Sequence, residues 1–261
     1  MRTLFKHFAA LICAVVGLGT AGVASANPTI LINDSNGNLI SYDTVTKAST
    51  RLSNTGSTMF DIAQNSGGDL FGVNGSTLFK ISPTTGATTT LGSLGAFVNG
   101  LVFGPDGTLF GSGDSNLYKI NPTSGQASLI GAMGVNSAGD LAFFKGQLYL
   151  ASNLGLALVN SASGAASLIA GSTPDFFGLA STADTLFGVK GNGIYSIDPT
   201  TGVGTSVASY SGSAAYGASS LPVTTPTAVP EPATWAMMLL GLVLVGYALR
   251  RRGNAPRVAI A

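Results

Sequence analysis

LFKISPTTGA at residues 78–87 and LYKINPTSGQ at residues 117–126 are two copies of one ten-residue phrase. The phrase recurs three more times in weaker form, as LISYDTVTKA from Leu39, LALVNSASGA from Leu156 and IYSIDPTTGV from Ile194. The five starts are separated by 39, 39, 39 and 38 residues. A second apolar run begins eight residues upstream of each start, at Leu31, Leu70, Leu109, Leu148 and Leu186. Self-similarity at a fixed period of this length indicates a repeat architecture.

Each repeat has the composition of short strands joined by tight turns. Runs of four to eight residues are rich in Leu, Phe, Tyr, Val and Thr, and Gly, Asn, Asp, Ser and Pro bound them. Four repeats end their turn on a glycine that can adopt positive φ, namely Gly86, Gly125, Gly164 and Gly202. The first repeat has Lys47 at this place. A left-handed lysine costs about 1–2 kcal/mol relative to glycine, unless that turn has another shape.

A repeat of about 39 residues that holds four short strands is typical of a β-propeller blade. The first repeat lacks the strand that contains Phe60 or Phe177 in later repeats. The segment around Tyr216 can supply the missing strand, because Tyr216 follows Phe177 by 39 residues, the length of one repeat. We therefore expect an all-β, five-bladed propeller over residues 27–221, closed by pairing of its last strand with its first blade. An open β-solenoid of the same units is the alternative. It does not require the last strand to pair with the first repeat.

The N-terminal residues have the pattern of a secretory signal peptide. Arg2 and Lys6 precede a short apolar run, and small residues follow up to Ala24-Ser25-Ala26. A basic region, an apolar core and an A-x-A site in this order are typical of such peptides. We expect export through the Sec translocon and cleavage at the site formed by Ala24 and Ala26, with loss of residues 1–26.

The C-terminal region combines a short motif, an apolar segment and an arginine cluster. Val229-Pro230-Glu231-Pro232 precede the apolar residues 233–249, and Arg250-Arg251-Arg252 follow. The apolar segment would reach about 25 Å as a helix, near the lower limit for crossing a membrane. Arginines at its end favour a cytoplasmic location for that end. We expect one transmembrane helix, with residues 253–261 as a cytoplasmic tail and the Pro/Thr-rich residues 222–229 as a stalk.

This order of features resembles the PEP-CTERM protein-sorting signal, also called the ice-binding protein C-terminal domain. The resemblance covers residues 228–252, and the alternative name implies nothing about ice for this chain. It implies that an exosortase processes residues 229–232 of an inner-membrane intermediate, which then reaches the cell surface or extracellular matrix of a Gram-negative bacterium. The tail at 253–261 departs from the family, whose members usually stop soon after the arginines. A plain C-terminal membrane anchor is the alternative. GLVFGPDGTLFG at residues 100–111 is similar to repeats of secreted bacterial propellers, a likeness of fold alone.

The composition excludes several classes of function. Only 9% of the residues are charged and the formal net charge is +1, so no basic surface for nucleic acid is expected. His7 and Cys13 are the only residues of their types, and both lie in the signal peptide. The mature chain therefore lacks Ser-His-Asp and Cys-His nucleophile systems, zinc ligands of the usual kind, and disulfides. We expect no cofactor and no metal.

Carboxylates are the remaining candidates for chemistry. Between residues 27 and 229 there are ten Asp, no Glu and six Lys or Arg, a net charge of −4. Some five-bladed propellers are glycosidases that use carboxylates in the central channel. Asp61 and Asp140 lie on the equivalent strand of different blades, but their repeat phases differ by one residue. Because side chains alternate along a strand, both cannot face the channel without a bulge.

Polar residues recur in the turns between apolar strands. The loop from Asn33 to Asn38 resembles the start of a calcium loop, but no bidentate Glu follows, and an Asn-Gly turn explains it without metal. We take as a candidate ligand rim the residues Asp34, Asn36, Asn74, Asp114, Asn153 and Asn192. The aromatic residues at one recurring strand position, Phe79, Tyr118 and Tyr195, are expected to pack between blades.

These observations favour a non-catalytic exported protein, a binding, adhesion or structural module with extracellular polysaccharide as a candidate ligand. The alternative is a carbohydrate-active enzyme that uses Asp carboxylates in the channel. A spacer without a small ligand is a third possibility.

Overall fold

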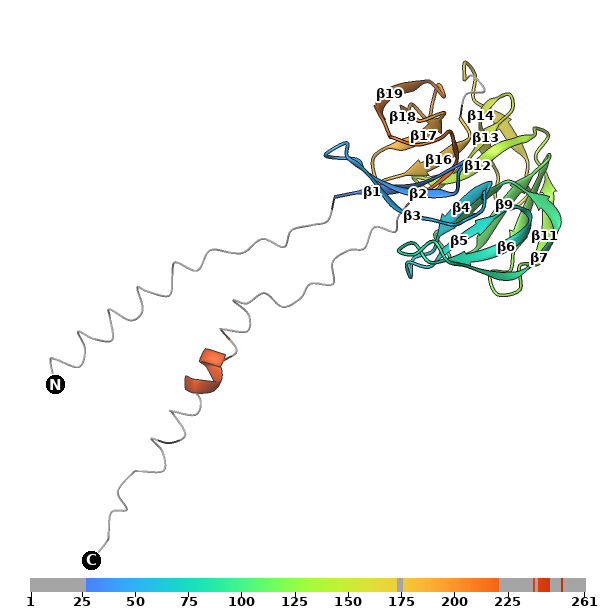
Figure 1. Cartoon of the computed structure of the whole chain (residues 1–261). Coiled ribbons are helices and arrows are strands. Elements are labelled where there is room, and N and C mark those ends of the chain that lie inside the picture. The colour runs from blue at the N-terminus through green and yellow to red at the C-terminus, as the bar shows by residue number, and fades with distance from the viewer. Residues whose placement is uncertain (1–26, 173–175, 221–236, 238, 245–249, 251–261) are drawn as a thin grey trace, which may run out of the picture. The chain divides into compact units, whose positions relative to one another are not determined.

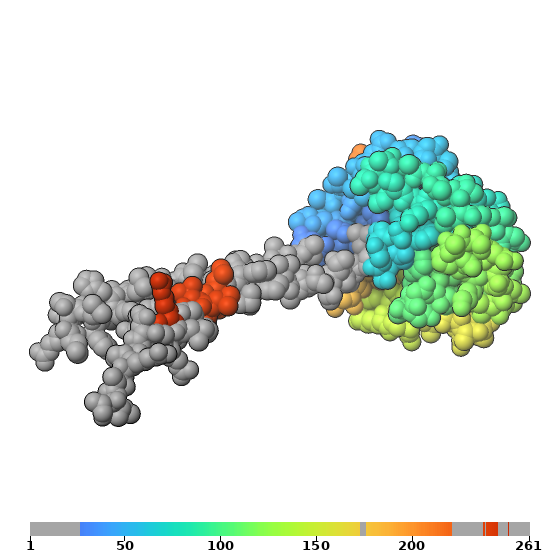
Figure 2. Space-filling view, turned by 90° about the horizontal axis from the view of Figure 1, so that it is seen from below, coloured from blue at the N-terminus to red at the C-terminus, as the bar shows by residue number. Residues whose placement is uncertain are grey.

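The computed structural model describes residues 27–172, 176–220, 237, 239–244 and 250. Twenty strands lie in this part of the chain and form five antiparallel sheets of four strands each. Asn27–Thr224 form one compact unit. Figure 2 shows its described residues as a rounded body whose surface runs from blue through green to yellow.

Four sheets follow the chain in order. The second blade holds β4 (Asp61–Gln64), β5 (Leu70–Val73), β6 (Gly75–Ile81) and β7 (Thr88–Val98). The third holds β8 (Gly100–Phe103), β9 (Leu109–Gly113), β10 (Asn116–Ile120) and β11 (Ala127–Ala132). The fourth holds β12 (Ser137–Phe144), β13 (Gln147–Ser152), β14 (Gly155–Val159) and β15 (Ala166–Leu168). The fifth holds β16 (Gly178–Ser181), β17 (Leu186–Lys190), β18 (Gly193–Ile197) and β19 (Gly204–Ser209).

The first blade joins the two ends of the repeat region. Its strand order is β20 (Ala215–Ser220), β1 (Thr29–Asp34), β2 (Asn38–Asp43) and β3 (Ser49–Asn54). In the antiparallel pairing of β20 with β1, Ser220 lies opposite Ile30 and Gly217 opposite Asn33. The expected return of the last strand to the first blade is thus confirmed, and the open solenoid is wrong.

The innermost strands of the five blades form a closed ring. Contacts run from β4 to β8, β12, β16 and β20, and from β20 back to β4. Figure 1 shows the result, with blue β1 and β2 lying between the brown β16–β19 sheet and the teal β4–β6. A closed ring protects the inner sheet edges from pairing with other chains.

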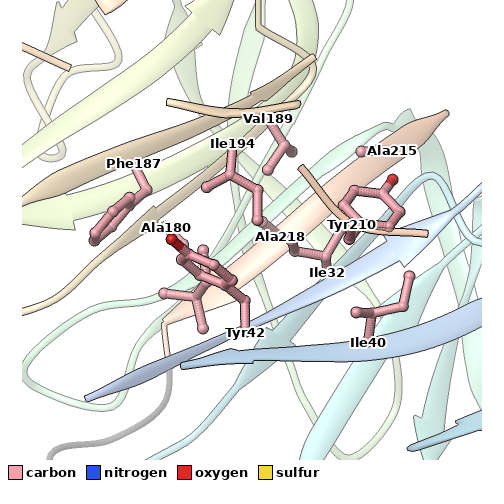
Figure 3. Packing of buried hydrophobic residues seen from close by; sticks show 11 residues of the cluster. Ile32, Ile40, Tyr42, Ala180, Phe187, Val189, Ile194, Tyr210, Ala215 and Ala218 are labelled. Atoms are coloured by element: carbon pink, nitrogen blue, oxygen red, sulfur yellow. The ribbon is translucent and has the colours of Figure 1, made fainter. Parts of the chain in front are cut away.

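Apolar side chains fill the space between neighbouring blades. Figure 3 shows the cluster between the first and fifth blades, where Ile32 and Tyr42 face Phe187, Val189 and Ile194. The Tyr42 and Phe187 rings meet edge-on, with centroids 6.5 Å apart. Serine side chains add polar links, since Ser181 N donates to Ser220 Oγ at 2.7 Å. The recurring aromatic residues Phe79, Tyr118 and Tyr195 also pack, partly buried, against such clusters.

The expected turn conformations are present. The four glycines that close the hairpins have positive φ, with Gly86 at 77°, Gly125 at 79°, Gly164 at 80° and Gly202 at 68°. Lys47 adopts the same conformation, with φ of 63°, so the first repeat keeps the turn shape despite its side chain. Lys47 Nζ donates to Thr44 O at 2.6 Å, which partly offsets the strain.

The two faces of the disc differ in what they carry. We call the face at which the innermost strands begin the front face, and the opposite one the back face. Because neighbouring strands are antiparallel, the turns between the second and third strands of each blade also lie on the front face. β1 begins, and β20 ends, on the back face.

Residues 237, 239–244 and 250 are helical. In the described part of the chain, no helix has the length and apolar character required to cross a membrane. Most of the span expected at residues 233–249 lies outside the described residues, as do the signal peptide and the Pro-Glu-Pro motif.

Candidate functional site

Two aspartates and three glycines meet at the centre of the ring. Asp61 pairs with Val73 across its blade, Gly100 with Ser112 and Asp140 with Ala151, so they hold equivalent positions. Gly178 and Gly217 complete the set. Both aspartates are fully buried. Because their phases differ by one residue, the sequence predicted that both could face the channel only with a bulge. The structure has such a bulge, since the register of β12 shifts between Ser137 and Asp140.

Glycine leaves the space that the carboxyl groups occupy. A Cβ atom on Gly217 would collide with Asp61 Oδ1 and lie 2.8 Å from Asn33 Oδ1. A Cβ atom on Gly100 would lie 3.1 Å from the Cα of Asp140 and collide with Ser112 Oγ. The blades therefore approach the axis closely enough for two side chains to fill its centre.

The two carboxyl groups bind one backbone N–H group from each blade. Asp61 accepts from Ile62 N at 2.8 Å and from Leu101 N at 2.5 Å. Asp140 accepts from Leu141 N at 2.5 Å, Leu179 N at 2.6 Å and Ala218 N at 3.0 Å. A hydrogen bond also joins the two carboxyl groups. We call this arrangement the axial pair.

Burial changes the acid–base behaviour of the axial pair. It raises the pKa of Asp61 well above its usual value, and the neighbouring charge of Asp140 raises it further. Burial also raises the pKa of Asp140, against the hydrogen bonds from Asp61 and the three N–H groups, which favour its charged form. Two carboxylates at hydrogen-bonding distance cannot both ionise readily. The pair therefore shares at least one proton at neutral pH.

A hollow on the front face lies where the innermost strands begin. Its volume is about 230 Å³. Its lining consists of Phe60, Phe97, Asn99, Ala138, Gly139, Phe177 and Tyr216. We call it the axial cup. Three of the rings are well exposed, since Phe177 keeps 49% of its surface, Phe97 44% and Tyr216 37%.

Aromatic side chains dominate the axial cup. The Phe60 ring lies 6.0 Å from the Phe97 ring and 6.3 Å from the Tyr216 ring, centroid to centroid. Asn99 and Tyr216 carry the polar groups of the lining. Asn99 Nδ2 donates to Ser137 O at 3.3 Å, and Asn99 Oδ1 is buried without a partner. No charged side chain lines the cup. Exposed apolar surface gathered in a concave site is typical of a binding site.

The structure places the candidate ligand rim on the front face. Asn36, Asn74, Asp114, Asn153 and Asn192 are exposed in the turns between second and third strands. None of them belongs to the lining of the cup. Asp114 adopts positive φ of 49°, as its turn requires.

Asp34 differs from the rest of the rim because it is fully buried. Its Oδ1 accepts from Asn36 N at 3.0 Å and Asn38 N at 2.9 Å. Its Oδ2 accepts from Asn38 Nδ2 at 2.8 Å and Ser213 N at 3.1 Å. The carboxylate thus links the first turn of the chain to the segment before β20, and we leave it out of the proposed ligand surface.

A larger groove of about 610 Å³ opens on the back face of the fifth blade. Its lining includes Lys145, Asp184, Asp198 and Pro199, all from turns. Similar depressions on the third and fourth blades have the same turns as walls. They follow the shape of the blade, whereas the cup gathers aromatic side chains from several blades.

The sequence analysis did not single out the cup aromatics as site residues. Their signal was nevertheless present, because Phe60, Phe177 and Tyr216 recur at multiples of the repeat interval, near the start of an innermost strand. No cluster of three or more His, Cys, Asp or Glu side chains that could hold a metal occurs among the described residues. The sorting residues Val229 to Pro232, Arg251 and Arg252, and the cleavage residues Ala24 and Ala26, lie outside them, whereas Arg250 is helical.

Known proteins resemble the chain in two separate regions. The family profile of the PEP-CTERM protein-sorting motif matches residues 228–252. A search of curated protein sequences found no match. Among solved structures, a chain of the "Crystal structure of Nidogen/Laminin Complex" has a TM-score of 0.52 at 12% identity, covering 75% of this chain and 99% of that one. This likeness concerns the fold alone.

Two other solved structures have a weaker similarity to the chain. One is described as "The de novo evolutionary emergence of a symmetrical protein is shaped by folding constraints", with TM-score 0.48, 24% identity, and coverage of 73% of this chain and 93% of that one. The other is a protein of unknown function from Bacteroides caccae, with TM-score 0.43, 12% identity, and coverage of 70% and 73%. The sheet topology makes the chain a five-bladed β-propeller, and the PEP-CTERM protein-sorting motif at residues 228–252 indicates an exported protein that an exosortase sorts.

Proposed function

We propose that the protein is a non-catalytic binding module of the cell surface or extracellular matrix, and that its axial cup binds a neutral carbohydrate. The observation that carries this proposal is the gathering of Phe60, Phe97, Phe177 and Tyr216 around the axis of the front face. Export through the Sec translocon, passage through the inner membrane and delivery to a polysaccharide-rich matrix form the cellular setting of the proposal.

The chemistry of the cup suits a sugar ring. The C–H groups on one face of a pyranose pack against an aromatic ring, while its hydroxyl groups need hydrogen-bonding partners at the edge. Asn99 and Tyr216 are the lining residues with polar side chains, and a volume of about 230 Å³ accepts one ring rather than a long chain. Because no charged side chain lines the cup, nothing there attracts an acidic sugar.

The position of the cup suits a surface-attached protein. β1 begins and β20 ends on the back face, opposite the cup. The described strands therefore enter and leave the disc on the face opposite the cup.

The axial pair favours binding over glycoside hydrolysis. Glycosidases hold their two carboxyl groups about 5–5.5 Å apart when they retain configuration and about 6.5–9.5 Å apart when they invert it. Asp61 and Asp140 instead hydrogen bond each other, and both are fully buried. Because neither carboxyl group is exposed, a sugar cannot reach them, so we assign the pair no catalytic step.

A glycan array with the propeller unit, residues 27–224, tests the proposal. Stacking contributes about 1–2 kcal/mol per aromatic contact, so Phe177→Ala and Tyr216→Ala should each weaken binding about tenfold. Leu129→Ala is the matched control, because Leu129 is 63% exposed on the outermost strand β11. Equal binding by all variants would refute the role of the cup. Preferential binding of peptides, or turnover of a polysaccharide by the wild-type protein, would refute the assigned function.

The sorting step has its own test. Mass spectrometry of the exported protein should find a C-terminus near residues 230–232, because the PEP-CTERM motif directs processing there. An exported form that keeps residues 250–252 would contradict exosortase processing and favour a plain membrane anchor.

A further inference from the structure

The axial pair and the axial cup are adjacent along every innermost strand. Phe60 is followed by Asp61, Gly139 by Asp140, and Tyr216 by Gly217. Asn99 and Phe177 likewise precede the ring glycines of the third and fifth blades. Five of the seven cup residues are thus one peptide unit from a ring position, the exceptions being Phe97 and Ala138. The N–H group that follows each ring position donates to the pair.

We infer that Asp61 and Asp140 are positioning residues for the cup, and that their shared proton makes its shape, and hence ligand binding, dependent on pH. The inference rests on the proposed function for its ligand-binding part only. With the proton present, the carboxyl groups hydrogen bond each other and hold all five innermost strands at one spacing. Without it, two negative charges repel at short range, and the strands bearing the cup residues move apart.

The surroundings of the pair leave it without another means to compensate charge. Beside the pair, Ser112 Oγ of β9 lies close to Gly100, and Asn33 Oδ1 of β1 lies close to Gly217. All of these are neutral. In the described part of the chain, each carboxyl group is the charged neighbour of the other, and the remaining contributions come from burial and backbone N–H groups. Five N–H donors stabilise one negative charge on the pair. A second negative charge would be destabilised by burial and by repulsion from the first.

Because the pair is buried, its carboxyl groups stay protonated to a higher pH than exposed carboxyl groups do. Burial raises the pKa of both groups. No His or Glu lies between residues 27 and 224, so little else titrates between pH 5 and pH 7. The N–H donors to the pair come from all five blades, which spreads the effect of one proton around the whole ring.

The experiment follows the pair and the cup in one titration. In the propeller unit with ¹³C-labelled aspartate and aromatic side chains, NMR spectra are recorded from pH 5 to pH 9.5. The Cγ signals of Asp61 and Asp140 should titrate together, well above the range of the exposed aspartates. Ring signals of Phe177 and Tyr216 should shift with the same midpoint. Unchanged ring signals during titration of the pair, or a pair that keeps one charge state throughout, would overturn the inference.

Variants separate this effect from other causes. Asp61→Asn removes the second charge and should abolish the coupled ring shifts, whereas Asp114→Asn, an exposed front-face carboxylate, should leave them unchanged. Tyr216→Phe removes the phenol of the cup, and Phe177 should still respond with the midpoint of the pair. The wild-type titration decides the matter even where a variant does not fold.

A ligand measurement distinguishes the inference from the proposed function. With cellohexaose as the probe, affinity should fall at least fivefold between pH 6 and pH 9 in the wild-type protein and stay level in Asp61→Asn. Coupled ring shifts without cellohexaose binding would support the inference and count against a β-glucan ligand. Binding that is independent of pH would overturn the inference and leave the proposed function standing.

Discussion

The free energy of unfolding of the propeller unit should fall as the pH rises from 5 to 7. The cause is the axial pair, whose two fully buried carboxyl groups hydrogen bond each other at the centre of the ring. In the unfolded chain both groups ionise near pH 3.9. In the folded protein they keep at least one proton across this range, since burial raises the pKa of both.

The sign follows from proton binding. Between pH 5 and 7 the folded state holds at least one proton more than the unfolded state, so rising pH favours unfolding. One extra proton corresponds to a slope of about 1.4 kcal/mol per pH unit. Stability from the raised pKa is complete below about pH 3.9 and declines until the pH passes the folded-state pKa. From pH 5 to pH 7 the loss should be on the order of 3 kcal/mol.

Other groups do not obscure this slope. No His or Glu lies between residues 27 and 224, so the usual titrating side chains of this range are missing. At lower pH the trend reverses. A hydrogen bond from Asn27 lowers the pKa of Asp43 to about 2, and hydrogen bonds from Thr200 lower that of Asp198. These exposed turn carboxylates stabilise the fold only above pH 4 and lose that contribution as they protonate.

Urea unfolding followed by far-ultraviolet circular dichroism at pH 5, 6 and 7 measures the slope. The double variant Asp61→Asn/Asp140→Asn is the control, and its stability should be level over this range. A wild-type stability that is constant or rises between pH 5 and 7 would refute the shared proton. The single variants add a ranking: Asp140 accepts three N–H groups and Asp61 two, so Asp140→Asn should be the more destabilising by about 1 kcal/mol.

Two further substitutions test the geometry of the ring. Gly217→Ala places a methyl group against Asp61 Oδ1 and should cost about 2–3 kcal/mol of unfolding free energy; Gly67→Ala, in a roomy turn, should change it by less than about 0.5 kcal/mol. Asp34→Ala removes the link to Ser213 N and should cost about 2–3 kcal/mol. Hydrogen exchange should then accelerate first at Ser213 and in β20, and equal protection there in both proteins would show that the link does not hold the ring closed.

Local chemistry made much of the fold predictable from the repeats. A strand of alternating apolar residues and a turn that needs positive φ are short-range features, and they recur at a 39-residue interval. The phase of Tyr216 was sufficient to predict that the last strand joins the first blade. Even Lys47, which lacks the glycine of its counterparts, adopts the shared turn with φ of 63°. The sheet that surrounds a short turn therefore overrides the preference of one residue.

The site was less predictable because it depends on register and on long-range proximity. Counting repeats separated Asp61 from Asp140 by one residue in phase, and a bulge in β12 cancels that difference. A bulge costs little and leaves no clear mark in a single sequence. Asp34 has the composition of a polar rim, yet its carboxylate is buried by a segment 179 residues away.

Repeat spacing, turn chemistry and the C-terminal pattern were enough to identify the blade, the closure of the ring and the sorting motif. Each of these features depends on short sequence patterns and on their spacing along the chain. Tertiary structure decided the rest. Only the meeting of five strands at one axis brings two distant carboxyl groups together with five N–H groups, and only there do aromatic residues from separate blades form one cup. Burial and proximity arise from the packing of the blades as a whole, so they change a pKa or create a binding surface in ways that no single repeat contains.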